Sequence, residues 1–284
     1  MANQKAGFHT TIDIPGTSIP SVAFGTWKLG QGQQSTDHVE QAISIGFNHI
    51  GEYTAQAYRN ESEAGIAIRE SGLPREDLYI TTKFSGRDGL DIETSIQNSL
   101  DYLGLKYVDL YLIHAPSLAV PDIPTAWAKM EKLREAGLAK RIYFQPYILS
   151  TQMPIVEYGN KYGIVSEAYS VLTPLTSQPG GPVDKPLQKI ASRLNSQPEQ
   201  VLLAWAKSKG VVAVTASTKK ERLEGYLAAG DLELTAEDIA AIDAAGLAGE
   251  SRLTLRKVLR RAAYITLVGG AVVAACTFMG IRVL

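Results

Sequence analysis

Three side chains of this sequence could together deliver a proton to an alcohol oxygen or remove one from it. They are the phenol of Tyr58, the amine of Lys83 and the imidazole of His114, and each lies near the end of a separate apolar, strand-like run. Tyrosine in water loses its proton near pH ~10, so an adjacent ammonium group is the natural way to make it a usable acid. Parallel strands followed by helices would bring the three positions to one end of a barrel.

The elements that would position these residues alternate between strand-like and helix-like patterns, which predicts a parallel α/β architecture. Residues 7–14 and 18–23 are expected to form a hairpin that plugs the barrel floor. The strands that follow are predicted at residues 48–50, 78–83, 108–114, 139–142, 164–169 and 211–215. The helices are predicted at residues 36–45, 61–70, 92–103, 125–136, 187–195, 198–209, 219–229 and 236–245.

Length and composition limit the classes of function. The 284 residues are enough for one barrel domain, expected over residues 1–250, and a further segment over 251–284. A net charge of −1 gives no general attraction to nucleic acid, and a single cysteine cannot form an intramolecular disulfide. The four histidines and the cysteine lack metal-ligand spacing, and no Gly-x-Gly-x-x-Gly fingerprint follows a strand. We therefore expect neither a metal site nor a Rossmann dehydrogenase.

The C-terminal segment differs from the rest of the chain. Residues 262–281 contain no charged side chain, and a run of about 20 such residues can span a bilayer as a helix. Five basic residues between 252 and 261 would hold the preceding domain on the cytoplasmic side. We expect a single-pass membrane anchor with a cytoplasmic catalytic domain; the alternative is a cytoplasmic protein whose last helix packs on the barrel.

Several short motifs, in their order along the chain, resemble the aldo-keto reductase family, of the fungal NADPH-dependent keto-reductase type. These motifs are Phe24-Gly25-Thr26-Trp27, Gly46-Phe47-Asn48-His49-Ile50, Tyr58-Arg59-Asn60-Glu61, Asp109-Leu110-Tyr111-Leu112-Ile113-His114, Gly137-Leu138-Ala139-Lys140 and Ala168-Tyr169-Ser170. The resemblance implies a (β/α)₈ TIM barrel. It also implies a monomeric enzyme that reduces aldehydes or ketones, including α-keto esters or amides, with NADPH.

The resemblance implies a role for each residue of the catalytic group. Tyr58 would donate a proton to the carbonyl that receives hydride, Lys83 would lower the pKa of Tyr58, and His114 would orient the carbonyl. An ammonium group stabilises a phenolate, which agrees with this division of labour. Taken singly, Tyr58 could be an ordinary half-buried tyrosine and His114 a core histidine.

The implied cofactor site is made of residues that follow strands. They are Gly25, Thr26, Tyr169, Ser170, Ser217, Thr218 and Arg222. The resemblance places the nicotinamide ring on Tyr169 and the adenosine 2′-phosphate beside Arg222, which favours NADPH over NADH. Trp27 would line the substrate pocket. A solvated basic helix start is the alternative for the segment around Arg222.

The sequence departs from the family pattern at two places. The pattern His-Ile-Asp-Thr-Ala-x-x-Tyr has an aspartate that pairs with the lysine, but here Tyr53 holds that position and two residues are inserted. Glu52 would point to the opposite face of its strand. Residues 140–142 also lead directly into 143–147, so a strand–helix unit of roughly 30 residues is absent, with the ligands of the carboxamide. We therefore expect a barrel that is incomplete by one strand–helix unit.

Matching residues flank both departures, so they resemble junction errors. An incorrect gene model is the first explanation, and a natural splice form or a decayed paralogue is the second. The alternative function is that of a catalytically impaired pseudoenzyme that binds the cofactor or serves as a scaffold.

Overall fold

A curled parallel sheet forms the centre of the protein. The computed structural model describes residues 11–14, 17–27, 29–51, 60–114, 116–144 and 166–249. The strands of this sheet are β3 (Val22–Gly25), β4 (His49–Gly51), β5 (Tyr79–Phe84), β6 (Val108–Ile113), β7 (Ala139–Phe144), β8 (Ser166–Tyr169) and β9 (Val211–Thr215). They run in the order β7-β6-β5-β4-β3-β9-β8, and all neighbours are parallel. The architecture is therefore α/β, as predicted.

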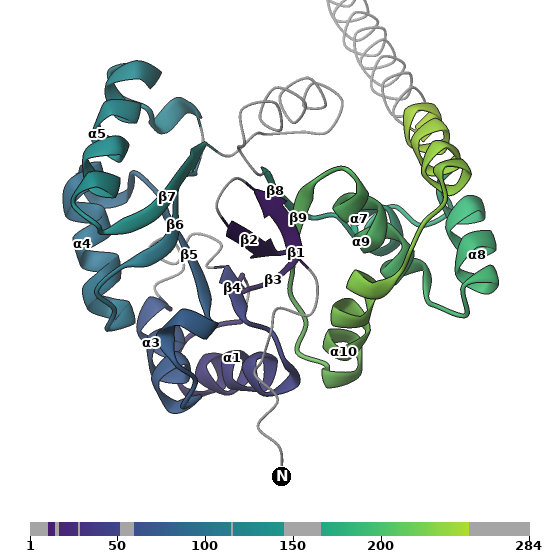
Figure 1. Ribbon diagram of the computed structural model, residues 1–284, viewed down its shortest axis with the longest axis horizontal. Coiled ribbons are helices and arrows are strands. Elements are labelled where there is room, and N and C mark those ends of the chain that lie inside the picture. Colours follow the sequence, from purple (N-terminus) through teal and green to yellow (C-terminus); the bar gives the residue numbers. More distant parts are fainter. Residues whose placement is uncertain are drawn as a thin grey trace, which may run out of the picture.

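Helices surround the strands on the outside (Figure 1). They are α1 (Gln33–Ile45), α3 (Glu61–Glu70), α4 (Ile92–Leu103), α5 (Ile123–Glu135), α7 (Thr173–Thr176), α8 (Asp184–Arg193), α9 (Pro198–Ser208) and α10 (Lys220–Ala228). Residues 236–249 are also helical, and short 3₁₀ turns lie at Arg75–Asp77, Arg87–Gly89, Pro116–Leu118 and Ala229–Asp231. Local signals set several helix ends. Asp91 caps α4 by accepting a hydrogen bond from the Thr94 N–H at 2.7 Å, and Gly104 ends it at φ 68°.

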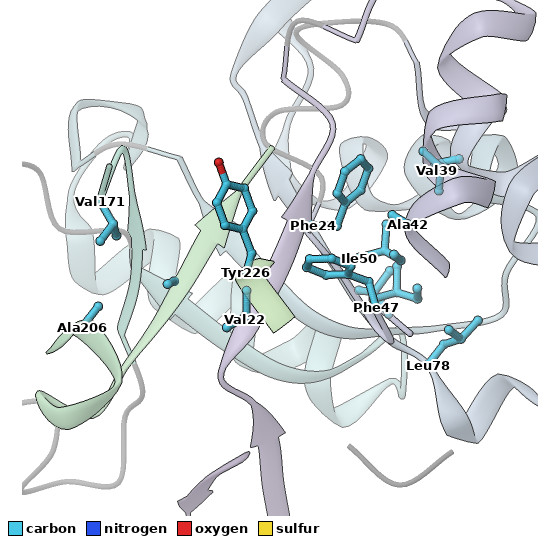
Figure 2. Packing of buried hydrophobic residues seen from close by; sticks show 14 of the residues in the cluster. Val22, Phe24, Val39, Ala42, Phe47, Ile50, Leu78, Val171, Ala206 and Tyr226 are labelled. Atoms are coloured by element: carbon cyan, nitrogen blue, oxygen red, sulfur yellow. The ribbon is translucent and has the colours of Figure 1, made fainter. Parts of the chain in front are cut away.

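The main core lies between the sheet and these helices. Alternation along β3 sends Val22 and Phe24 outward, where Phe24 meets Phe47 with ring centroids 5.7 Å apart. Figure 2 shows this pair and Ile50 lying beside Val39 and Ala42, which belong to α1. The burial of these apolar side chains fixes the helices on the outer face of the sheet.

A second, smaller cluster fills the inside of the curled sheet, which we call the lumen. It consists of Ile19, Ala23, Tyr79, Leu110, Leu112, Val212 and Val214. The hairpin of β1 (Thr11–Ile14) and β2 (Thr17–Pro20) packs on it through Ile12 and Ile19. The predicted hairpin is thus present, but its second arm is shorter than expected. Residues 22–25 leave the hairpin after Pro20 and become β3, because their outward side chains find a partner in the main core.

The second departure from the family pattern, the junction between Ile142 and Tyr143, lies inside one strand. β7 passes through Ile142 and Tyr143 without a break and pairs with β6, Ile142 opposite Tyr111 and Tyr143 opposite Leu112. A join within a strand preserves the ladder of hydrogen bonds. β7 and β8 stand at the two ends of the strand order, and residues 145–165 between them lie outside the described residues. The predicted loss of one strand–helix unit therefore stays a prediction.

The predicted C-terminal membrane helix and membrane partner require a correction. Among the helices of the described ranges, none is both long and apolar enough to cross a membrane. The helices α1 and α5 have 13 residues each, whereas a span needs about 20 apolar residues. Residues 262–281, on which the prediction rested, lie outside the described residues. The chain is accordingly not assigned a membrane partner.

Candidate active site

The parallel sheet gathers the predicted site residues at one rim. Because all seven strands run the same way, their carboxyl ends meet at the same end of the lumen. Thr26 follows β3, Lys83 is the next-to-last residue of β5, and His114 follows β6. Tyr169 ends β8, and Ser217 comes two residues after β9. Tyr58 belongs to residues 52–59, which lie outside the described residues, so its predicted role stays a prediction.

Lys83 is a buried cation in the wall of the lumen. Its side chain is on the same face of β5 as Tyr79 and Thr81, and its residue is only 1% exposed. Burial lowers the pKa of the Lys83 amine to about 8, while the negative charge of Glu167 opposes this effect. An amine with this pKa is still mostly protonated at neutral pH and can stabilise a nearby phenolate.

His114 is fixed next to Lys83 by the backbone. Its N–H donates a hydrogen bond to the carbonyl oxygen of Phe84, the residue after Lys83, at 3.1 Å. Burial lowers the pKa of the half-buried His114 imidazole to about 4, and the positive charge of Lys83 contributes to the shift. The ring is therefore neutral at physiological pH and presents one N–H donor.

A buried polar cluster lies deeper in the lumen than these two residues, and the sequence motifs did not predict it. Glu167 of β8 accepts a hydrogen bond from the Thr81 hydroxyl at 3.3 Å, and its carboxylate lies 3.5 Å from Nε2 of His49. His49 and Thr81 are themselves hydrogen-bonded at 2.8 Å. The signal was present, because Glu167 is a charged residue inside an otherwise uncharged strand and lies two positions before Tyr169. By alternation, it shares the lumen face with Tyr169.

The loop after β3 has the features of a cofactor cradle. Thr26 is fully buried, yet its hydroxyl has no hydrogen-bond partner within the described residues. Asn60 donates to the carbonyl oxygens of Thr26 and Gly30 at 3.3 and 3.4 Å and so holds the loop in place. A Cβ at Gly25 would lie only 3.0 Å from Val214 Cγ1, so this position accepts no larger side chain without movement. The unpaired hydroxyl and the bare backbone fit a ligand group above β3.

The other predicted cofactor residues lie on two further loops of the rim. Ser170 adopts a left-handed backbone conformation with φ 59° directly after β8. Ser217 accepts a hydrogen bond from the Lys219 N–H at 3.1 Å in the turn that leads into α10. Thr218 and Arg222 are exposed at the start of α10, where an anion could bind. Trp27, predicted to line the substrate pocket, is 43% exposed.

Comparison with known proteins agrees with this geometry. The model of a family described as the aldo/keto reductase family matches residues 21–170 and 178–246. A "NAD/NADP-dependent indole-3-acetaldehyde reductase" of Schizosaccharomyces pombe is 29% identical over 88% of this chain and 98% of its own length. The "Methylglyoxal reductase DkgB" of Escherichia coli is 34% identical over 80% of this chain and 94% of its own. The structure of the Bombyx mori aldo-keto reductase AKR2E4 in complex with NADP superimposes with a TM-score of 0.71 at 29% identity, covering 82% of this chain and 91% of that one.

Proposed function

This chain belongs to the aldo-keto reductase family, and we propose that it binds NADP(H) and reduces aldehydes or ketones at a depressed rate. It is an NADP-dependent oxidoreductase by family, as the fungal and Bombyx relatives indicate. The substrate class we propose is that of activated carbonyls, including α-keto esters or amides. The observation that carries the proposal is the buried Lys83 side chain at the carboxyl end of β5, with His114 fixed beside it by its hydrogen bond to the Phe84 carbonyl oxygen.

The proposed division of labour follows from these charges. Tyr58 gives its proton to the carbonyl oxygen, and the ammonium group of Lys83 stabilises the phenolate that remains. The neutral ring of His114 donates a hydrogen bond to the same oxygen and orients it. Bound NADPH would supply the hydride.

Residues of the rim would contact the nicotinamide ring, the pyrophosphate and the 2′-phosphate of the cofactor. The Thr26 hydroxyl, which has no hydrogen-bond partner in the described part of the chain, and the backbone of Gly25 would approach it from β3. Tyr169 would stack on the nicotinamide ring, and Ser170 would lie beside the pyrophosphate. Ser217, Thr218 and Arg222 would hold the 2′-phosphate at the start of α10 through charge-assisted hydrogen bonds.

Two features of this chain favour a lower rate. Tyr53 stands where the family pattern has the aspartate that pairs with the lysine. β7 also passes directly through the Ile142–Tyr143 junction, where the family pattern has a further strand–helix unit with the carboxamide ligands. These features support a second candidate function, a pseudoenzyme that binds the cofactor without turnover.

The variant Tyr58→Phe tests the proposed chemistry. With methylglyoxal as the probe carbonyl, we expect turnover to fall by roughly 10²–10⁴-fold. NADPH affinity, measured by fluorescence titration, should stay nearly unchanged, because the hydroxyl is needed only for proton transfer. Tyr102→Phe, at an exposed position of α4, is the control. Undiminished turnover in Tyr58→Phe would remove Tyr58 from the mechanism. A wild-type chain that binds NADPH but reduces nothing would support the pseudoenzyme.

A further inference from the structure

We propose that Glu167 is a positioning residue for Lys83, a carboxylate that faces its ammonium group within the lumen. The inference rests on the proposed function, since it concerns the cation that would stabilise the Tyr58 phenolate. A residue of β8 thereby acquires a role in the reaction, which the sequence motifs do not predict.

The first support is the reach of the Glu167 side chain. Glu167 lies on β8, but its Oε1 atom contacts the hydroxyl of Thr81 on β5 at 3.3 Å and Nε2 of His49 on β4 at 3.5 Å. In the strand order, β8 is separated from β4 by β9 and β3. The carboxylate therefore lies inside the curl of the sheet, beside the strand that carries Lys83.

The second support is the position of Lys83 relative to these contacts. Lys83 follows Thr81 by two residues and shares its face of β5, so the two residues are about 7 Å apart along the strand. The opposite charges of the two groups favour each other's ionised form. Burial raises the pKa of the Glu167 carboxyl, but its hydrogen bond to His49 and the positive charges of His49 and Lys83 hold that pKa below its usual value. Glu167 in turn raises the pKa of the Lys83 amine.

The third support is an unsatisfied atom. Glu167 is only 4% exposed, and its second oxygen, Oε2, has no hydrogen-bond partner in the described part of the chain. A buried carboxylate oxygen in that state is unfavourable unless a positive charge compensates it. Within the described residues, the charge of Glu167 acts on the Lys83 amine, the charge of Lys83 in turn acts on His114, and His49 lies behind Glu167. Of these, Glu167 supplies the negative charge.

This arrangement bears on the first departure from the family pattern. The aspartate that would pair with the lysine is replaced by Tyr53. Burial alone would drive the Lys83 amine towards its neutral form, which cannot stabilise a phenolate. A carboxylate on β8 opposes this tendency from inside the sheet.

The test is a titration of Lys83 in the full chain. Lysine labelled with ¹³C and ¹⁵N gives an NMR signal for each side chain, and the Lys83→Arg variant identifies the signal of Lys83. We expect Glu167→Gln to lower the pKa of Lys83 by about 1 unit or more, the range for loss of a nearby opposite charge. The matched control is Glu61→Gln. Glu61 is an equally buried carboxylate, but it bonds to Thr82 at 2.9 Å on the helix-facing side of β5.

The outcomes separate this inference from the proposed function. Glu167→Asp keeps the negative charge on a shorter side chain, so it should lower the pKa of Lys83 less than Glu167→Gln does. If the glutamine variant fails to fold, the aspartate variant still tests the inference. Where turnover is present, the alkaline limb of the kcat profile should move to lower pH in parallel. An unchanged Lys83 titration in Glu167→Gln, or an equal change in Glu61→Gln, would overturn the inference. A chain without turnover would count against the proposed function and leave the Lys83 titration readable.

Discussion

His114 lies in the electric field of Lys83, and burial lowers the pKa of both side chains. Each side chain loses hydration as it enters the lumen, so each pKa falls, to about 8 for Lys83 and to about 4 for His114. The result is one cation and one neutral ring side by side at neutral pH. Two cations at this place would repel each other, so the charge of Lys83 favours the neutral ring of His114, which keeps one N–H donor.

The lowered pKa of His114 makes a prediction about acid stability. Its folded-state value of about 4 lies below the ordinary 6.5, so between these values the unfolded chain binds more protons at this residue than the folded chain does. The free energy of unfolding therefore rises with pH across this window and falls on acidification. We expect His114→Gln to flatten that part of the profile in urea unfolding from about pH 4 to about pH 7. His38→Gln on α1 is the control, and a profile in His114→Gln parallel to that of the wild type would contradict the prediction.

At the adenosine end, Arg222 should distinguish the two cofactors. We expect Arg222→Ala to weaken NADPH binding by about 1.5–3 kcal/mol per charge-assisted hydrogen bond lost, and NADH binding hardly at all. Paired titrations of both cofactors measure the difference. Lys129→Ala on α5 removes a charge from the surface pair with Glu93 and serves as the control. Equal losses for NADPH and NADH would rule out a contact with the 2′-phosphate.

Between elements, specific contacts hold the barrel wall together at the end opposite the site. Asp109 of β6 accepts a hydrogen bond from the Ile80 N–H of β5 at 2.9 Å and pairs with Arg75 at 2.6 Å and with Lys140 of β7 at 3.0 Å. Both cations lie over the ring of Tyr107, 4.2 and 4.3 Å from its centroid. This cluster ties three neighbouring strands together, so the rim that carries Lys83 and His114 is built on a fixed base.

Close approach of α3 and α4 leads to a prediction at Gly65. A Cβ there would lie 2.6 Å from the carbonyl oxygen of Leu103, whereas a Cβ at Gly225 in α10 would meet nothing within 4 Å. Alanine usually stabilises a helix by about 0.5–1 kcal/mol relative to glycine. We expect that gain for Gly225→Ala, but a loss of about 1–3 kcal/mol for Gly65→Ala, because the helices must move apart. Urea unfolding of the two variants makes the comparison, and a stabilised Gly65→Ala would show that the contact is loose.

On the scale of the whole molecule, the sheet has its two ends at β7 and β8 in the described part of the chain. A closed barrel requires strand number, tilt and stagger to agree. The cluster of His49, Thr81 and Glu167 joins β8 to β4 and β5 through the lumen rather than through the sheet. It therefore links the β8 end of the sheet to the middle strands across the lumen.

A repaired chain tests whether the departures weaken the molecule. We would insert a family-like strand–helix unit between Ile142 and Tyr143 and restore the Asp-Thr-Ala-x-x-Tyr spacing before Tyr58. Each buried polar group that the unit satisfies is worth about 1–3 kcal/mol, against a usual net stability of about 5–15 kcal/mol. We expect a higher Tm and tighter NADPH binding than in the original chain. A Gly/Ser insert of the same length is the control. An original chain that melts as high and binds as tightly as the repaired one would show that the departures are harmless.

Much of the fold could be predicted from the sequence because its signals are local. The apolar spacing of residues 92–103, the cap at Asp91 and the left-handed Gly104 define α4 without reference to the rest of the chain. Because the strands are expected to be parallel, Lys83 and His114 are predicted at the same rim of the sheet, and they lie there in the structure. Family motifs extend this reasoning to the cofactor class, because the order of motifs is itself a property of the sequence.

Other features were decided only by tertiary structure. Residues 18–23 alternate like one hairpin arm, and only the burial of residues 22–25 between β4, β9 and the outer helices makes them a separate strand of the parallel sheet. Thr81 and Glu167 are 86 positions apart, and nothing local indicates that they touch. Their contact depends on how far the sheet curls and how its strands are staggered. Every strand contributes to both, so neither can be read from one segment of the sequence. A sequence can therefore determine which face a side chain takes, but the curl of the sheet decides what that side chain meets inside.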